Sequence, residues 1–255
     1  QKAQRRTATS RNAECSTTNF NNMSIVKTVG TIVRVTDLTK TAKEVTIKTE
    51  AQINFIPGQF VNLFIEIAGE KVRRAYSISS TDFNINEFSV AIRLSPDGKM
   101  SPLFWQKDIT NEKIELMGPL GLNTADKMKS KKVFLFAYGI GAGVIKSLAS
   151  HFSAEQQIES LNIVTGSRFE DEIVYRDYFD TLAKENSKVK VLHVISKPTD
   201  TCTLAKGYIQ NNIEQFDFNN SDVYVCGQDI ACNQLVEKIK TKNPVGVKYY
   251  IEGFH

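Results

Sequence analysis

Arg74, Tyr76 and Ser77 place a fixed cation, a phenol and a hydroxyl within four residues of the sequence. The residues around them, 72–79, are typical of a β-strand, in which alternate side chains share a face, so Arg74 and Tyr76 point the same way. A guanidinium two residues from an aromatic ring suits a ligand with a phosphate at one end and a flat ring at the other. A surface strand with a packed tyrosine would have the same residues, so this stretch alone leaves both interpretations open.

A glycine-rich turn, Gly139-Ile140-Gly141, joins an apolar strand predicted at 133–138 to a helix predicted at 142–152. Such a turn lets backbone N–H groups approach a pyrophosphate at the positive end of the helix. A tight turn that only packs the strand on the helix is the alternative. The strand–turn–helix context favours a nucleotide site.

Two more polar groups stand at the ends of later strands. A hydroxyl next to a guanidinium, as in Ser167-Arg168, could hold a 2′-phosphate and would favour NADP over NAD. A surface arginine neutralised by the acidic residues 170–172 is the alternative. Cys226-Gly227 ends a strand at the sheet edge where ligands bind in parallel sheets, although a lone cysteine is more often a core residue.

Composition excludes several classes of protein. The chain of 255 residues is 41% hydrophobic and 24% charged, which is ordinary for one large or two modest globular domains. Residues 1–22 carry +3 of the net charge of +4, so the remainder gives no sign of a nucleic-acid partner. The four cysteines lack C-x-x-C spacing and only three histidines occur, so no metal site is expected. The most apolar window, 133–145, is too short to span a membrane.

The pattern of elements changes near Lys127. Before it, short strands and one small helix predict a compact antiparallel β-barrel, with strands at 29–35, 45–49, 60–67, 72–79, 87–94 and 113–117 and the helix at 100–106. After it, apolar strands alternate with helices, which predicts an α/β doubly wound parallel sheet. The strands are expected at 133–138, 161–165, 189–195, 223–226 and 245–251, and the helices at 142–152, 173–185, 208–214 and 229–240.

We therefore expect two domains, at 23–128 and 129–255. Residues 1–22 are rich in Ser, Thr, Asn and Arg with few large apolar residues, which predicts a disordered tail. The tail is either an added tag or the remnant of a targeting peptide. These alternatives predict a cytoplasmic protein or one in an organelle matrix, respectively, and free cysteines suit either compartment.

Taken together, these stretches resemble the ferredoxin–NADP⁺ reductase superfamily over almost all of 28–254. The motifs that carry the resemblance follow the family's order on the expected elements: Pro57-Gly58-Gln59-Phe60, Arg74-Ala75-Tyr76-Ser77, Gly98-Lys99-Met100-Ser101, Gly139 with Gly141, Gly166-Ser167-Arg168, Glu172-Ile173-Val174-Tyr175, Lys206-Gly207, Cys226-Gly227, and Glu252 with Phe254. The resemblance implies an FAD-binding barrel followed by an NAD(P)-binding α/β domain.

The resemblance also implies the residues that bind FAD and NADP (or NAD). The flavin residues would be Arg74, Ala75, Tyr76, Ser77, Ile92, Arg93, Gly98, Lys99, Met100 and Ser101, with Phe254 or His255 shielding the ring. The pyridine nucleotide would be bound by Gly139, Gly141, Ser167, Arg168, Cys226 and Gly227. Three of the implied residues are catalytic: Ser77 at flavin N5, Cys226 beside nicotinamide C4, and Glu252 closing the site.

The function implied by the resemblance is that of an NAD(P)H-dependent flavoprotein reductase. It would pass hydride to FAD and then electrons to a ferredoxin, a flavodoxin or an oxygenase component. Two departures fall in the nucleotide half: Ala142-Gly143-Val144 replaces the family's I-A-P, and Gln228 replaces the proline of C-G-P. They leave two alternatives open, a flavin-bearing electron-transfer subunit of a larger complex and a non-catalytic structural subunit. The missing cysteine cluster excludes reductases with a fused ferredoxin.

Overall fold

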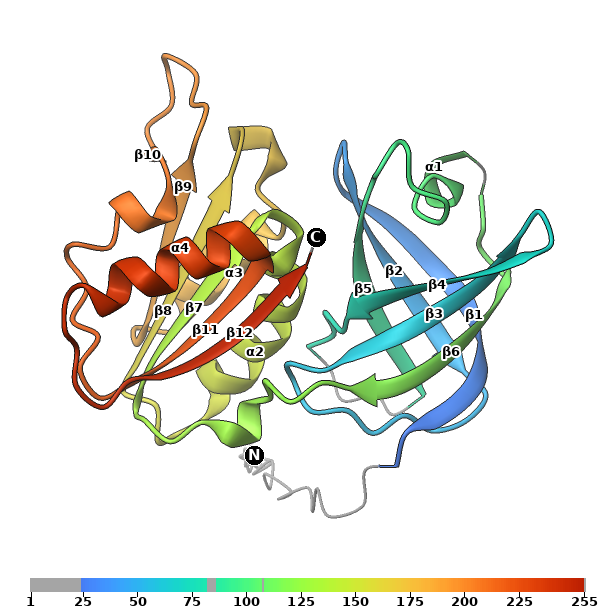
Figure 1. The fold of residues 1–255 in the computed structure, drawn as a ribbon, viewed down its shortest axis with the longest axis horizontal. Helices are drawn as coiled ribbons and strands as arrows, with labels where there is room; N and C mark the ends of the chain where they lie inside the picture. The colour runs from blue at the N-terminus through green and yellow to red at the C-terminus, as the bar shows by residue number, and fades with distance from the viewer. Residues whose placement is uncertain (1–23, 82–85, 107, 255) are drawn as a thin grey trace, which may run out of the picture.

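The computed structural model describes residues 24–81, 86–106 and 108–254, which form two sheets lying side by side (Figure 1). The tail predicted at 1–22 and His255 lie outside the described residues. Each sheet has six strands, and the chain completes the first sheet before it begins the second.

The first sheet is antiparallel and curls into a barrel, as the sequence predicts. Its strands lie in the order β4-β3-β6-β1-β2-β5. An isolated bridge between Ile78 and Val90 brings the two edges together. The strands are β1 (Val26–Thr39), β2 (Ala42–Thr49), β3 (Phe60–Ile67), β4 (Glu70–Ser77), β5 (Glu87–Arg93) and β6 (Lys113–Leu120), with the short helix α1 at Leu103–Gln106.

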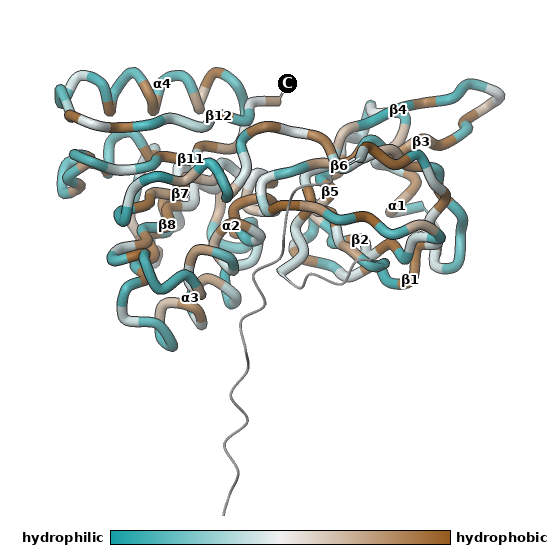
Figure 2. Tube along the Cα trace, turned by 90° about the horizontal axis from the view of Figure 1, so that it is seen from below, coloured by the Kyte–Doolittle hydropathy of each residue, from teal (hydrophilic) through white to brown (hydrophobic). Residues whose placement is uncertain are grey.

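The second sheet is parallel, with helices on both faces. Its strands lie in the order β10-β9-β8-β7-β11-β12. They are β7 (Lys132–Tyr138), β8 (Ser160–Ser167), β9 (Val189–Ile195), β10 (Ala205–Lys206), β11 (Ser221–Gln228) and β12 (Lys248–Phe254). Helices α2 (Ala142–Ala154) and α3 (Arg176–Glu185) cover one face, and α4 (Asp229–Lys240) covers the other (Figure 2). This arrangement confirms the predicted doubly wound sheet.

Two predicted elements differ from the structure for identifiable reasons. The helix expected at 208–214 is only a 3-10 turn at Ile209–Asn211, because the Asn212 amide donates to the carbonyls of Lys206 and Tyr208. The strand expected at 245–251 begins at Lys248, because Gly246 makes a turn with a positive φ before it.

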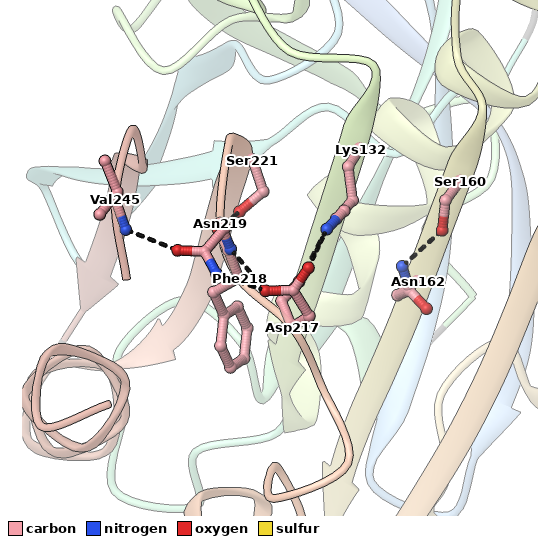
Figure 3. A network of polar contacts seen from close by, with 8 residues as sticks. All are labelled: Lys132, Ser160, Asn162, Asp217, Phe218, Asn219, Ser221 and Val245. Atoms are coloured by element: carbon pink, nitrogen blue, oxygen red, sulfur yellow. Dashed lines mark hydrogen bonds and ion pairs between the residues drawn. The ribbon is translucent and has the colours of Figure 1, made fainter. Parts of the chain in front are cut away.

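The amino-terminal edge of the parallel sheet is held by a polar network (Figure 3). The Asp217 carboxylate accepts hydrogen bonds from Lys132 Nζ at 2.6 Å and from the Asn219 backbone and side-chain N–H groups. Asn219 Oδ1 in turn accepts from the Val245 N–H at 2.8 Å. The polar groups of this network are hydrogen-bonded to one another and connect the loops at the amino-terminal edge. The cavities described below lie at the opposite edge of the sheet.

Asp222 fastens the segment that connects the two sheets. Its side chain is fully buried, and one carboxylate oxygen accepts hydrogen bonds from the backbone N–H groups of Lys129 (2.8 Å) and Ser130 (2.5 Å). The Tyr250 hydroxyl lies 3.3 Å from the other oxygen and donates at 2.7 Å to the Lys127 carbonyl. Asp222 and Tyr250 thus both anchor this connection to strands β11 and β12.

Replacing Asp222 by alanine is expected to lower the free energy of unfolding by about 1–3 kcal/mol, because it leaves the part-buried N–H groups of Lys129 and Ser130 without their acceptor. Urea unfolding followed by circular dichroism measures the change. Asp217→Ala, which removes an exposed carboxylate from the same sheet, is the matched control and should cost less. Equal losses in the two variants would contradict this account of Asp222.

Candidate functional site

Two cavities meet where the barrel faces the carboxyl edge of the parallel sheet. The interdomain cavity, of about 510 Å³, lies between β4 and β5 on one side and the turn that begins α2 on the other. The sheet-edge cavity, of about 750 Å³, is lined by the carboxyl ends of β7, β8, β11 and β12. Both cavities are lined by Arg93, Ile140 and Phe254. Ligands in the two cavities would therefore lie against the same three side chains.

The interdomain cavity is lined by part of the stretch from which the sequence analysis started, namely Tyr76 and Ser77 but not Arg74. Ala75, Tyr76 and Ser77 line it from β4, and Phe254, the last residue of β12, lines it from the other domain. The Tyr76 side chain packs against the barrel core, and burial raises its pKa to about 12, so the phenol stays neutral at physiological pH. The walls thus offer an aromatic ring and a hydroxyl within a volume typical of ligand sites.

Ser77 and Glu252 join the two domains at the base of this cavity. The Ser77 hydroxyl donates a short hydrogen bond to Glu252 Oε1, across 175 positions of the chain. Burial raises the pKa of Glu252, and the hydrogen bond from Ser77 opposes that rise. The pair can therefore hold a proton at the edge of the cavity.

Cys226 lies beside Glu252 but beneath the cavities. The two residues are register partners on the parallel strands β11 and β12. The thiol is buried, and burial raises its pKa well above the usual range, with a further contribution from the charge of Glu252. Cys226 lines neither of the two cavities above, and together with Glu252 it lines a small cavity of about 10 Å³. The structure thus brings the three predicted catalytic residues together. The neutral Cys226 thiol lies behind Glu252, away from the walls of the two cavities.

Arg74 and Lys99 supply cations at the solvent side of β4. Arg74 Nη1 donates to the Arg73 carbonyl at 2.8 Å, and no carboxylate among the described residues pairs with Arg74. Lys99 Nζ lies 2.5 Å from Glu70. The hydrogen bond and charge of Lys99, followed by the charge of Arg74, lower the pKa of Glu70. An arginine without a carboxylate partner suits a phosphate group, so this stays the predicted pyrophosphate position, but Lys99 is paired with Glu70, and neither cation lines the two cavities.

The rest of the predicted pyrophosphate turn is structural. The Gly98 N–H closes a turn on the Ser95 carbonyl at 2.9 Å. Met100 is buried in the barrel core, and the Ser101 hydroxyl accepts from the Ser95 N–H at 2.9 Å. The side chains of Met100 and Ser101 therefore face inward, and the turn offers a ligand only its backbone and Lys99.

The structure separates the two neighbouring residues Ile92 and Arg93. Ile92 is fully buried in the barrel core, so its side chain cannot flank an adenine as predicted, because alternate residues of β5 point into the barrel. Arg93 points the other way, lines both cavities and pairs with Glu172 of the other domain at 3.5 Å. Gly139 has a φ of +54°, which other residues rarely adopt and which accounts for the glycine there; the tip of the Arg93 side chain lies next to it.

The sheet-edge cavity holds the predicted nucleotide residues Gly139, Ser167 and Arg168. The alternative for Arg168 was that the acidic residues 170–172 neutralise it, and the structure shows no such ion pair among the described residues. Those acids have other partners: Glu170 bonds Thr199, Asp171 pairs with Lys40 and Glu172 with Arg93. No carboxylate among the described residues pairs with Arg168, so its guanidinium is available to an anionic ligand.

The glycines Gly141 and Gly227 permit close backbone packing beneath this cavity. A Cβ on Gly141 would lie 2.3 Å from the Cys226 carbonyl oxygen, and one on Gly227 (φ +152°) would lie 2.5 Å from Tyr138 Cβ. These residues bring the turn after β7 against the end of β11. Gly227 lines neither of the two large cavities, and Gly141 lines only the interdomain one.

The two departures from the family pattern leave the cavities open. A Cβ on Gly143 would lie 2.9 Å from Ala91 Cβ, so the glycine lets the start of α2 approach the barrel. Gln228 is exposed, lines the sheet-edge cavity and immediately precedes α4. The first change is therefore a packing adjustment between domains, and the second adds an amide to the cavity wall.

Sequence reasoning missed two apolar residues of the sheet-edge cavity. Tyr208 and Ile230 line it while 59% and 67% exposed. Tyr208 belongs to the stretch Lys206-Gly207-Tyr208-Ile209 that resembles the family, but neither it nor Ile230 was assigned a role, because both fall in segments whose periodicity predicts helices. The available signal was the position of Ile230, which starts a helix directly after the Cys226-Gly227 motif but lies outside the apolar face.

Within the described ranges, no three His, Cys, Asp or Glu side chains gather in a way that could hold a metal ion. In the same ranges, no helix has both the length and the apolar character needed to cross a membrane.

Known proteins match both halves of the chain. Residues 30–124 match the family model of the oxidoreductase FAD-binding domain, and residues 135–238 match that of the oxidoreductase NAD-binding domain. The chain is 26% identical to the toluate 1,2-dioxygenase electron transfer component of Pseudomonas putida, over 80% of this chain and 60% of that protein. It is also 26% identical to ferredoxin–NADP reductase B of Sorangium cellulosum, over 69% of this chain and 75% of that protein.

The fold is similar to that of a ferredoxin NADP⁺ reductase from Neisseria gonorrhoeae with bound FAD and NADP. The TM-score is 0.76 at 18% identity, over 88% of this chain and 98% of that one. The two family models fall on the two sheets, and the cavities meet between them. The neutral Tyr76 and the Ser77 hydroxyl line a cavity of a size typical of ligand sites, and Arg74 on the same strand adds a cation suited to the phosphates of a flavin dinucleotide. The chain therefore belongs to the ferredoxin–NADP⁺ reductase superfamily, with an FAD-binding domain followed by an NAD-binding domain.

Proposed function

We propose that the protein takes hydride from NAD(P)H onto FAD and delivers electrons to a small redox protein, such as ferredoxin or flavodoxin, or to an oxygenase component. One observation carries the proposal: the interdomain and sheet-edge cavities share Arg93, Ile140 and Phe254, so two bound ligands would lie against the same side chains. The names of relatives, an electron transfer component of a dioxygenase and a ferredoxin–NADP reductase, support this class of acceptor.

In this proposal the chain's own residues hold and align the ligands. Arg74 and Lys99 bind the FAD pyrophosphate, and Tyr76 packs on the ring system from the barrel side. Arg168, with Ser167, binds the phosphate end of the pyridine nucleotide. Ser77 and Glu252 hold a proton at the junction, and buried Cys226 supports Glu252 from below. When bound, FAD supplies a two-electron acceptor that can release electrons singly.

We further propose that the domain boundary lies between residues 128 and 129. The last barrel strand, β6, ends at Leu120, and β7 begins at Lys132. Asp222 of the second sheet binds the N–H groups of Lys129 and Ser130, which ties these residues to the NAD-binding domain.

We also propose a reducing compartment, the cytoplasm or an organelle matrix. The described cysteines, Cys202, Cys226 and Cys232, are all free, and free cysteines are typical of such compartments.

An anaerobic visible spectrum of the purified protein, before and after NADPH and then NADH, tests the proposed function. The expected result is a flavin spectrum, as purified or after reconstitution with FAD, that is bleached by one or both nucleotides. A flavin that neither nucleotide bleaches would refute the reductase and select the electron-transfer subunit instead. No flavin after reconstitution would leave only the structural-subunit alternative.

The preference for NADPH is proposed to depend on Arg168. Arg168→Ala should raise the KM for NADPH by about 10- to 100-fold and leave the KM for NADH nearly unchanged, because only NADPH carries the 2′-phosphate. Steady-state reduction of an artificial acceptor with each nucleotide measures both constants. The matched control is Arg176→Ala, which removes an arginine paired with Asp180 in the same domain. Parallel changes for NADH and NADPH would contradict the assignment.

A further inference from the structure

Glu44 is a largely buried carboxylate between the two domains, and the proposed chemistry makes no use of it. Its Oε1 lies 2.8 Å from Lys146 Nζ, 2.8 Å from the Tyr175 hydroxyl and 3.2 Å from the Ser79 hydroxyl. The side chains of Glu44 and Lys146 are only 16% and 14% exposed. A buried carboxylate that binds three donors strongly restricts the relative positions of all three.

The donors around Glu44 come from different parts of the fold. Glu44 itself is on barrel strand β2, and Ser79 follows the end of β4, two residues after Ser77. Lys146 is on α2 of the other domain. Tyr175 immediately precedes α3. The cluster therefore connects the barrel with two segments of the NAD-binding domain.

Tyr175 is held in an unusual conformation by this cluster. Its φ of +59° is in the left-handed region, which an aromatic residue rarely adopts. Lys146 Nζ lies 4.4 Å from the centre of its ring, and burial, followed by the charge of Glu44, raises the pKa of the phenol well above its usual range. The hydroxyl thus remains a proton donor to Glu44 in the physiological range.

Each attached segment leads directly to a cavity wall. Ser79 is continuous with Ser77 of the interdomain cavity, and α2 begins one residue after Gly141 of the same cavity. The segment that ends at Tyr175 contains Glu172 and Arg168 of the sheet-edge cavity. A shift of Glu44 or its partners would therefore change the distance between the walls.

We propose that Glu44 is a positioning residue for hydride transfer: by binding Ser79, Lys146 and Tyr175 it fixes the barrel against the NAD-binding domain at the separation at which the two cavities meet. This inference rests on the proposed function. Hydride transfer depends on close approach of donor and acceptor atoms, and misplacement by about 1 Å can cost about 10²-fold in rate.

The test compares the wild-type protein with Glu44→Ala and Glu44→Gln, each loaded with FAD. Glu44→Gln keeps a carbonyl acceptor for Tyr175 and Ser79 but removes the ion pair with Lys146. This milder variant tests the proposal if the alanine variant does not fold. Lys132→Met is the matched control, because it breaks the 2.6 Å ion pair with Asp217 at the opposite edge of the sheet. Stopped-flow reduction by NADPH gives the limiting rate and the nucleotide dissociation constant separately. Hydrogen exchange of the full chain, with and without FAD, reports the interface independently of activity.

The expected result for Glu44→Ala is a limiting rate at least tenfold lower, with FAD affinity within threefold of wild type. Glu44→Gln should fall between Glu44→Ala and wild type, and exchange should rise at 77–80 and 139–147 in both variants. Lys132→Met should change neither the rate nor this exchange. Wild-type limiting rates in both Glu44 variants would overturn the positioning role, even if their stability fell. If NADPH and NADH fail to reduce the wild-type flavin, the proposed function fails. Separately, hydrogen exchange at 77–80 and 139–147 that is the same in the Glu44 variants as in the wild type would overturn the inference about Glu44.

Discussion

Replacing Ser77 by alanine is expected to slow the reduction of bound FAD by NAD(P)H by about 10²- to 10³-fold, while FAD remains bound. The hydroxyl is the hydrogen-bond donor to Glu252 and lines the cavity proposed for FAD. Removing it takes a positioned donor from the reacting end of that cavity and leaves the Glu252 carboxylate without this partner. Stopped-flow reduction under anaerobic conditions measures the effect directly.

Two further observations make this expectation specific to Ser77. The hydrogen bond from Ser77 lowers the pKa of Glu252, so its loss should move the pH profile of flavin reduction to higher pH. Ser95→Ala is the matched control, because Ser95 lines the same cavity and its hydroxyl does not bond Glu252. A rate loss in Ser95→Ala as large as that in Ser77→Ala would show that any change in the cavity wall slows reduction.

Replacing Arg74 by alanine is expected to weaken FAD binding by about 10- to 150-fold, or about 1.5–3 kcal/mol, the range for hydrogen bonds to charged groups. The guanidinium is exposed and pairs with no carboxylate among the described residues, so its removal should affect the bound phosphate more than the fold. Arg74→Lys should lose less than Arg74→Ala because it keeps the charge but not the planar fork. Titration of FAD into the flavin-free protein, followed by fluorescence, gives the dissociation constants.

Arg73 provides the control for this experiment. It is adjacent in sequence and also exposed, but on β4 it pairs with Phe64, whereas Arg74 pairs with Leu63, so the two side chains lie on opposite faces. Arg73→Ala should leave the affinity for FAD nearly unchanged. If both variants lose affinity equally, the net charge of the strand binds the phosphate and the specific role of Arg74 is wrong.

Much of the fold could be predicted from the sequence, because its signals are local. Strands Phe60–Ile67 and Val189–Ile195 and helix Asp229–Lys240 have the predicted bounds. In each of them the apolar spacing agrees with the environment that the fold provides. The prediction failed at 208–214, where a side-chain amide replaces the hydrogen bonds of the expected helix. Such competition depends on geometry that periodicity does not contain.

The candidate site was predictable only through its motifs. Ser77 and Cys226 stand in recognisable stretches, whereas only the family resemblance implied that they act with Glu252. The structure has a hydrogen bond from Ser77 to Glu252 and places Cys226 in register with Glu252, and their catalytic roles stay a prediction. The inward direction of Ile92 could have been inferred from the alternation along β5. Glu44 could not, because a carboxylate on an ordinary strand becomes distinctive only when the second domain packs on it.

The Ser77–Glu252 hydrogen bond also has a consequence for biosynthesis. Ser77 leaves the ribosome with the barrel, whereas Glu252 is on β12, the edge strand that follows every other strand of the fold. Domains generally fold as units in the order of their synthesis. The growing polypeptide can therefore complete its first domain long before the carboxylate that faces Ser77 has been translated. Under the proposed function, catalytic competence requires the docking of β12, so a nascent or truncated chain that lacks this strand would retain the barrel without the Ser77–Glu252 hydrogen bond.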